Sequence, residues 1–328
     1  MGSGFQVKFG SYRNILRNNV CFNTNSPCIL LYDDFDKGAN IVEGNAIINT
    51  VADSGIQVAA GAIIRNNIVI GSFGSGITIT NDPLDIYNNE GNRNLTIEHN
   101  TFVNNQKYGI DFTSTPTNTF VLNNVALGNT QGDFSSTAQN GVVWENNAYN
   151  SGSVPSGVSA NGTIQVGTAS AELTSPSTYN VYPLSSSKLI NAGAPLLLPY
   201  DFNYFARNCK TPTIGAYEYS SSSNPGWTVQ KGFKVVNGTV SPCFYGNPCT
   251  SCGSSTSTST TGTNTGSGTG TNIGSGTGTN TGSSTGTVTS SSTGTITSSS
   301  TTSTTSSSPP SPLPFLLLIL FTLLPLFF

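Results

Sequence analysis

Three stretches of the chain, NIVEGNAIIN (residues 40–49), AIIRNNIVIG (62–71) and NLTIEHNTFVNN (94–105), repeat one pattern and decide the fold. In each, a short apolar run is closed by an Asn, and related stretches at 14–20, 120–126 and 142–148 extend the frame in both directions. The recurrent residues are Asn19, Asn45, Asn67, Asn100, Asn124 and Asn147. Their spacing lies mostly in the low twenties, with longer insertions in two units, which is typical of a solenoid.

A second short strand accompanies each of the early repeats. Residues 28–33, 55–59, 76–80 and 109–113 occupy matching places, and apolar residues alternate with other residues within them. Alternation with β-branched residues predicts strands that bury one face. Because no stretch shows a sustained period of 3.6 residues, we expect essentially no helix. The pattern therefore predicts an all-β solenoid of short strands.

Equivalent residues of successive coils in such a solenoid would stack about 4.8 Å apart. The recurrent Asn residues then predict a structural ladder, in which side-chain amides bond to one another and to the turn backbone. A second column, two residues before each of these Asn residues, reads Arg17, Glu43, Arg65, Glu98, Leu122 and Glu145. Its signs alternate over four coils, which predicts solvent-exposed ion pairs between coils, with a substrate track as the alternative.

His99 is the only His of the chain. It falls in the column that holds the following residues in the other coils: Asn18, Gly44, Asn66, Asn123 and Asn146. A column that accepts both Gly and Asn is a turn position, so we expect His99 to be structural or at the surface and not catalytic.

The repeats resemble those of right-handed parallel β-helix proteins of the pectate-lyase-like superfamily, over about residues 5–150. The resemblance implies a right-handed parallel β-helix. A second likeness lies at 184–219, where Asp201, Arg207 and the strand IGAYEY (214–219) resemble the closing segment of secreted β-helix proteins. Tyr204 stands where that pattern has Gly. Asp201, Arg207 and Glu218 are interpreted as structural ties, because the sequence shows no pocket around them.

The rest of the chain divides by composition. We expect coils over 1–150, a closing segment over 151–220, a Cys-containing segment over 221–252, a disordered Ser/Thr/Gly-rich stalk over 253–308 and a GPI-attachment signal over 309–328. A stretch without charge follows Lys234. Because MGSGFQVKFG lacks the apolar run of a signal peptide, we expect a missing N-terminal piece. A net charge of −3 without a basic run argues against nucleic-acid binding.

The cysteines indicate an oxidising compartment. Six of them, Cys21, Cys28, Cys209, Cys243, Cys249 and Cys252, allow fifteen disulfide connectivities, and a zinc site is the alternative. Three sequons predict N-glycosylation at Asn94, Asn161 and Asn237. Together with the tail, these features predict a glycoprotein on the extracellular face of the cell membrane.

Acidic residues gather in the two longest coils. Frame alignment brings Asp33, Asp34 and Asp36 of one loop to the same corner of the solenoid as Asp82, Asp85 and Glu90 of the other. Carboxylates in this number predict a calcium site, and solvated loop acids are the alternative. The corner also gathers cations and aromatic residues suited to sugars: Lys8, Arg13, Lys37, Arg93, Tyr32 and Tyr87.

The resemblance covers lyases, hydrolases and epimerases as well as adhesins, and a fold alone does not give a function. We expect a surface glycoprotein that binds or processes polysaccharide, with lyase-like chemistry if it is an enzyme. The alternatives are a non-catalytic adhesion protein and a structural coat protein. The sequence singles out no catalytic residue, and a hydrolase with paired carboxylates stays open.

Overall fold

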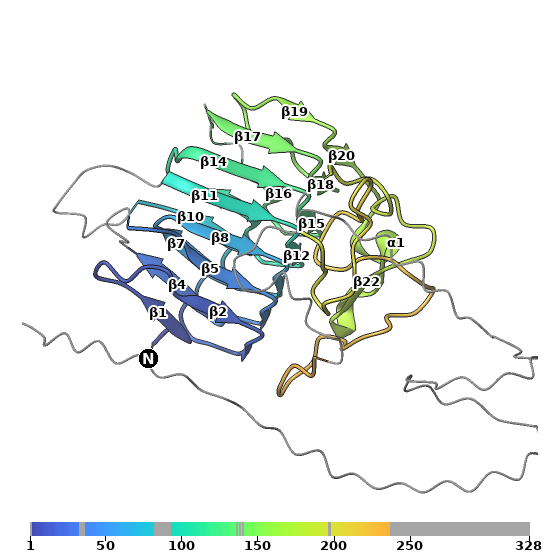
Figure 1. The fold of residues 1–328 in the computed structure, drawn as a ribbon, viewed down its shortest axis with the longest axis horizontal. Coiled ribbons are helices and arrows are strands. Elements are labelled where there is room, and N and C mark those ends of the chain that lie inside the picture. Colours follow the sequence, from blue (N-terminus) through green and yellow to red (C-terminus); the bar gives the residue numbers. More distant parts are fainter. Residues whose placement is uncertain are drawn as a thin grey trace, which may run out of the picture. The chain divides into compact units, whose positions relative to one another are not determined.

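In the computed structural model the chain coils repeatedly through three parallel sheets (Figure 1). The structure describes residues 2–32, 37–81, 93–135, 137, 139, 141–195 and 198–236. All of them belong to one unit, Met1–Ser259, and the second unit, Thr260–Phe328, lies outside the described residues together with the predicted stalk and GPI signal. Of the described helices, none is long and apolar enough to cross a membrane.

Each coil contributes one strand to each sheet, except that the last described coil has no strand in sheet A. Sheet A contains β1 (Phe5–Val7), β4 (Ile29–Tyr32), β7 (Ile56–Ala59), β10 (Ile77–Ile79), β13 (Tyr108–Phe112) and β16 (Gly132–Phe134). Sheet B contains β2 (Ile15–Arg17), β5 (Asn40–Glu43), β8 (Ala62–Arg65), β11 (Arg93–Glu98), β14 (Thr117–Leu122), β17 (Val142–Glu145) and β19 (Ala160–Asn161). Sheet C contains β3 (Val20–Phe22), β6 (Ala46–Ile48), β9 (Ile68–Ile70), β12 (Thr101–Val103), β15 (Val125–Leu127), β18 (Ala148–Tyr149) and β20 (Ile164–Gln165). The predicted all-β parallel β-helix is confirmed.

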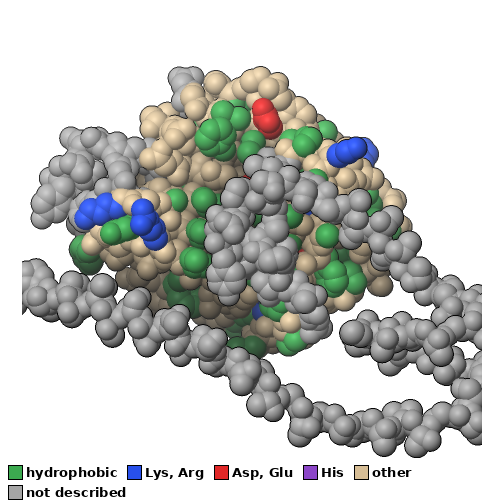
Figure 2. Space-filling model, in the orientation of Figure 1, with side chains coloured by type: hydrophobic (Ala, Val, Ile, Leu, Met, Phe, Trp, Pro, Cys, Tyr) green, Lys and Arg blue, Asp and Glu red, His purple; other side chains and the backbone are tan. Residues whose placement is uncertain are grey.

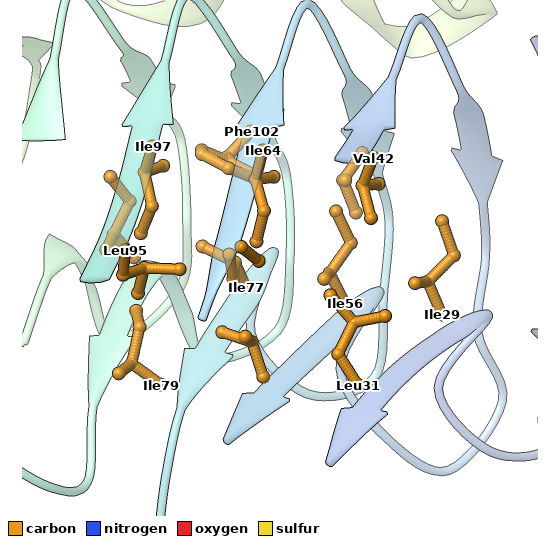
Figure 3. Packing of buried hydrophobic residues seen from close by; sticks show 14 of the residues in the cluster. Ile29, Leu31, Val42, Ile56, Ile64, Ile77, Ile79, Leu95, Ile97 and Phe102 are labelled. Carbon is orange, nitrogen blue, oxygen red and sulfur yellow. The ribbon is translucent and has the colours of Figure 1, made fainter. Parts of the chain in front are cut away.

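The alternating apolar residues fill the space between the sheets (Figure 3). In sheet A, Ile56 is in register with Ile29 on one side and with Ile77 on the other. In sheet B, Ile64 is in register with Val42 and Ile97. Each of these side chains is fully buried, and burial of one such side chain contributes about 1.5–3 kcal/mol. The period-two pattern thus forms the inner core directly.

Glycine stands at or next to the start of strands of sheet A, close to side chains of sheet C. A Cβ atom at Gly76 would lie 2.5 Å from Cδ1 of Phe102, and one at Gly109 would lie 2.6 Å from Cβ of Ala126. Contacts this short do not occur between real carbon atoms, so the column requires Gly.

The described residues of 166–236, here called the covering segment, pack over the outer face of sheet C and form a second core. This core joins apolar residues of β6, β9, β12 and β15 to Leu173, Tyr182, Phe202, Tyr217 and Trp227. The segment contains α1 (Ala169–Glu172), β21 (Leu173–Ser175), a 3-10 helix (Pro176–Thr178) and β22 (Asn180–Pro183). Helix in the described residues is limited to these two short turns, which agrees with the expectation of essentially none.

Candidate functional site

The six recurrent Asn residues lie in one column, which is buried except at its first member, Asn19. After the first of them, Asn19, the Oδ1 atom of each accepts two hydrogen bonds from the preceding Asn of the column, one from its backbone N–H and one from its Nδ2. For Asn100 these distances are 2.9 and 3.0 Å from Asn67, and Asn100 passes the pattern on through Nδ2 to Oδ1 of Asn124 at 3.0 Å. The second hydrogen of Nδ2 goes to the Ile64 carbonyl at 2.8 Å. Every polar atom of the side chain is therefore satisfied inside the solenoid.

The residue just before each ladder Asn adopts left-handed backbone. Values of φ lie between 47° and 64° for Asn18, Gly44, Asn66, His99, Asn123 and Asn146. Asn and Gly adopt this conformation most readily, which explains their dominance in the column. We call this set the outer column, and it marks the turn between sheets B and C.

The outer column is the docking line for the covering segment. Asn18 bonds to the Tyr204 hydroxyl, Asn66 to the Tyr200 carbonyl, Asn123 to the backbone of Ala194, and Asn146 to the Ala192 carbonyl, at distances of 2.7 to 3.0 Å. Gly44 takes part through its carbonyl oxygen, which accepts a hydrogen bond from Lys234. One polar contact per coil therefore fixes the covering segment along the whole solenoid.

His99 fills its place in the outer column as a buried neutral imidazole. Its Nδ1 lies 3.2 Å from the Gly215 carbonyl, and its Nε2 lies 3.1 Å from Nδ2 of Asn123. An acceptor facing Nδ1 and a donor facing Nε2 assign the proton to Nδ1. Burial, with the nearby charge of Arg207, holds the His99 pKa well below its usual value. The side chain is placed as a structural turn residue.

The alternating charge column pairs between coils, as predicted, but at Glu43 it is not solvent-exposed. Arg17 and Arg65 both bond to the Glu43 carboxylate, and Arg65 lies 3.9 Å from Glu98. The Glu43 side chain is only 1% exposed, because Tyr200 of the covering segment lies over it with its hydroxyl 3.4 Å from Oε2. The expectation of an exposed column is wrong at this end, since the sequence did not indicate where the covering segment would fold.

Asp201, Arg207 and Glu218 tie the covering segment together. The buried Arg207 guanidinium donates to the Tyr200, Thr213, Gly215 and Ala216 carbonyls, to Oε2 of Glu218 and to Oδ1 of Asn66. Asp201 accepts from the backbone N–H groups of Asn203, Phe205 and Glu218. Burial raises the pKa of both carboxyls and lowers that of the guanidinium. These contacts support the interpretation as structural ties. Tyr204 takes the positive φ of 68° at the place where the resembled pattern has Gly.

A second ladder, which the sequence did not indicate, lies at the turns that lead from sheet C to sheet A. Asn129 Oδ1 accepts from both nitrogens of Asn105 at 2.9 and 3.0 Å, and Asp133 accepts from both nitrogens of Asn129. The other oxygen of Asp133 ends the ladder on the backbone of Asn150 and Ser151. Only two of its members are Asn, so repetition was too short to reveal it.

Exposed aromatic and basic residues gather at the first turn between sheets A and B. Arg13 and Lys37 lie over the Tyr12 ring, at 5.7 and 5.8 Å from its centroid, and Lys8 lies over the Tyr32 ring at 5.4 Å. Tyr12 is 42% exposed and Phe9 is 80% exposed. In Figure 2, Lys and Arg side chains flank hydrophobic side chains on the side where the strands of sheet B begin in Figure 1. We call Lys8, Phe9, Tyr12, Arg13, Tyr32 and Lys37 the aromatic corner.

The predicted acidic site lies outside the described residues. Asp33, Asp34, Asp36, Asp82, Asp85 and Glu90 all fall there, as do Tyr87 and the Arg93 side chain. The strands that precede the two loops, β4 and β10, lie in sheet A with β7 between them. No group of three or more His, Cys, Asp or Glu residues among the described ones could hold a metal ion.

Three of the six cysteines and two of the three sequon Asn residues lie in the part of the chain that the structure describes. Cys21 and Cys28 form a disulfide between β3 and the start of β4, with Cα atoms 6.1 Å apart. Cys209 is also disulfide-bonded, and Cys243, Cys249 and Cys252 lie outside the described residues. Asn94 and Asn161 are exposed residues of β11 and β19, and Asn237 is not described.

The part of the chain that forms the coils has a relative among known families. Residues 3–162 match the family model described as periplasmic copper-binding protein (NosD). The match covers just under half of the chain and runs from β1 to β19. The similarity therefore concerns the parallel β-helix, and the family it names is one of periplasmic proteins and not of polysaccharide lyases. No individual curated protein matches the chain.

Proposed function

We propose that this chain is an extracytoplasmic protein that binds polysaccharide at the aromatic corner. The observation that carries the proposal is the combination of exposed aromatic rings, flanking cations and strained backbone at this one turn. Support for the compartment comes from the Cys21–Cys28 disulfide, since disulfides persist outside the cytosol, and from the periplasmic description of the matching family.

Backbone strain singles out this corner. Fifteen described residues other than Gly have positive φ, and ten of them are Asn. Three of the other five, His99, Tyr179 and Tyr204, are held there by bonds between the coils and the covering segment. The remaining two are Phe9 and Arg13, both at 56° and both in the aromatic corner. Strained residues cluster at ligand sites, where the surrounding structure imposes them.

The chemistry of the corner suits sugars. Aromatic rings present a flat apolar face for the C–H side of a pyranose, and Lys and Arg donate hydrogen bonds to hydroxyl or carboxylate groups. A polysaccharide lying across successive coils would meet Lys8, which follows β1, and Tyr32, which ends the neighbouring strand β4. We also propose that the acidic loops hold calcium, that the chain is N-glycosylated, and that it is attached to the cell surface.

Binding is favoured over catalysis by the position of the perturbed groups. In the described part, burial shifts the pKa of five groups that lie beneath or within the covering segment: Glu98, His99, Asp201, Arg207 and Glu218. Burial also raises the pKa of Asp111 and Asp133 in sheet A, where both carboxylates accept hydrogen bonds from other residues of the solenoid. A base that abstracts a proton from a sugar must reach it within hydrogen-bond distance. Buried groups cannot reach a sugar in this way, so their contacts favour a role in packing.

Copper binding, which the matching family's description names, is not supported by the residues that the structure describes. Copper prefers His, Met and Cys thiolate ligands. The chain has one His and one Met, and His99 is buried with both ring nitrogens engaged. Cys21, Cys28 and Cys209 are disulfide-bonded. We derive no function through copper.

Affinity electrophoresis of the full chain through gels containing neutral or acidic polysaccharides tests the proposal. At least one polysaccharide should retard the protein, and the double variant Phe9→Ala, Tyr12→Ala should abolish the retardation. Phe73→Ala is the matched control, since Phe73 is 47% exposed elsewhere on the solenoid. Equal retardation of the double variant and the control would show that the corner is not the binding surface. Absorbance near 235 nm in the same mixtures reports the lyase alternative.

A further inference from the structure

The amine of Lys234 reaches from a surface arm into the fold. Its Nζ donates to Oδ1 of Asn18 at 3.0 Å, to the Gly44 carbonyl at 2.9 Å and to the Phe202 carbonyl at 2.5 Å. The same atom lies 3.4 Å from the centroid of the Phe202 ring and 5.5 Å from that of Tyr204. Three acceptors match the three N–H groups that a lysine amine can present. The stem of Lys234 is partly exposed, whereas its amine is enclosed.

The amine cage, made of Asn18, Gly44, Phe202 and Tyr204, is held together without Lys234. Phe202 donates its N–H to the Ala216 carbonyl at 2.8 Å, and the Tyr204 hydroxyl bonds to Asn18 at 2.7 Å. Gly44 is the one Gly of the outer column among these coils, and a Cβ there would lie 2.7 Å from Oδ1 of Asn18 and 3.1 Å from Nζ. Gly44 thus leaves room for the amine.

The charges around the cage do not neutralise the amine. Glu43 and Asp201 face it and favour its protonation, but Glu43 is bonded to Arg17 and Arg65, and Asp201 to backbone N–H groups. Tyr200 and Tyr204 complete the surroundings, and burial raises the pKa of both hydroxyls. No carboxylate of the described residues accepts a hydrogen bond from Nζ. Desolvation therefore dominates and lowers the Lys234 pKa to about 7.

The arm that carries Lys234 has few other attachments. Phe233 is 96% exposed and Val235 is 54% exposed. Lys231 lies over the Phe22 ring at 4.0 Å, and Val236 packs on Leu198, Tyr200 and Tyr204. Because Asn18 and Gly44 belong to the first two coils, the amine joins the arm to that end of the solenoid.

We propose that the cage of Asn18, Gly44, Phe202 and Tyr204 is a binding site for a primary amine, occupied by the chain's own Lys234, so that residues 230–236 form a latch. A competing primary amine would displace Lys234 and free the arm. Loading of a cage that lacks Lys234 releases a proton in part, since the enclosed amine holds its proton less tightly than an amine in water.

Chemical complementation of Lys234→Ala in the full chain tests the latch. The variant should melt about 3 °C lower than the wild type. n-Butylamine, which replaces the missing stem and amine, should restore at least half of that loss at up to ~50 mM, since so small a ligand binds weakly. Restoration should strengthen between pH 6 and pH 8, and n-butanol, which has the same shape without the amine, should restore little. Equal restoration by n-butanol would show that the site is an apolar cavity that does not select for an amine, and would overturn the proposal.

Hydrogen exchange of residues 230–236 gives a second readout that does not depend on the stability of the variant. Lys234→Ala and Lys234→Met should each raise exchange of the arm at least tenfold, and n-butylamine should raise it in the wild type while exchange in the coils stays unchanged. Lys210→Ala, at an exposed position of the covering segment, is the control and should leave the arm unchanged. Unchanged arm exchange in both Lys234 variants would show that the amine does not hold the latch.

Discussion

The inner ladder and the outer column occupy neighbouring positions of the same six turns, yet their sequences differ in kind. The ladder is Asn in all six coils, whereas the outer column contains Asn, Gly and His. Each ladder residue meets another copy of itself one coil away. Each outer residue meets a different part of the non-repeating covering segment. Repetition in sequence therefore reflects contacts within the repeat, and variation reflects contacts with something outside it.

The largest effect should come from breaking the ladder. Asn100→Ala removes four hydrogen bonds, two accepted from Asn67 and two donated to Ile64 and Asn124, at a site without exposure. Each buried group left without a partner costs about 1–3 kcal/mol, so we expect a loss of roughly 3–5 kcal/mol in the free energy of unfolding. Urea denaturation followed by circular dichroism measures it. Asn161→Ala, at an exposed position, should change the stability by less than about 0.5 kcal/mol, and a similar loss in both variants would contradict the ladder's role.

This contrast also explains what the sequence could predict. The fold and the ladder repeat, so the spacing of Asn19 to Asn147 was enough to predict the coils, and the alternation within residues 55–59 was enough to predict a buried face that contains Ile56. The covering of Glu43 by Tyr200 could not be predicted, because a single contact between residues 157 positions apart leaves no period. The aromatic corner lies between these cases, since its cations and Tyr32 stand near one another in sequence whereas the strain at Phe9 and Arg13 appears only in the backbone.

An outer residue should lose less, and its loss should come from the covering segment. Asn66→Gly keeps the left-handed backbone, as Gly44 shows, but removes the bonds to the Tyr200 carbonyl and to the Arg207 guanidinium. A hydrogen bond to a charged group contributes about 1.5–3 kcal/mol, so we expect a loss of about 2 kcal/mol. Asn66→Ala should lose about 1 kcal/mol more, because Ala is strained at a φ of 52°. Equal stability of the two variants would mean that backbone conformation does not contribute to the choice of residue.

The Lys234 contact should show itself as a pH dependence. The enclosed amine has a pKa of about 7 against 10.5 for an ordinary lysine, so the unfolded chain binds one more proton between these values. The free energy of unfolding must then rise with pH from about 7 upward, by no more than about 1.4 kcal/mol per pH unit. Lys234→Met should lack this slope between pH 7 and pH 9, below the range where Tyr204, with its pKa raised to about 12, begins to differ from the unfolded chain. Parallel stability curves for the two proteins would contradict the enclosed amine.

The smallest effect on stability at neutral pH should come from replacing His99, the one His of the outer column, by the Asn that most coils have there. His99→Asn keeps the left-handed conformation, which Asn favours, but a shorter side chain gives up the contact of Nδ1 with the Gly215 carbonyl, so we expect a loss of about 1 kcal/mol at pH 8. The balance should change in acid. The His99 pKa is held well below 6.5 by burial, so the unfolded chain binds the extra proton, and the wild type must lose stability as pH falls below about 6.5. Asn does not titrate, so the variant should overtake the wild type toward pH 5 in urea denaturation. A constant difference across this range would mean that His99 is accessible to protons in the folded state, and that the outer column is less tightly covered than the inner ladder beside it.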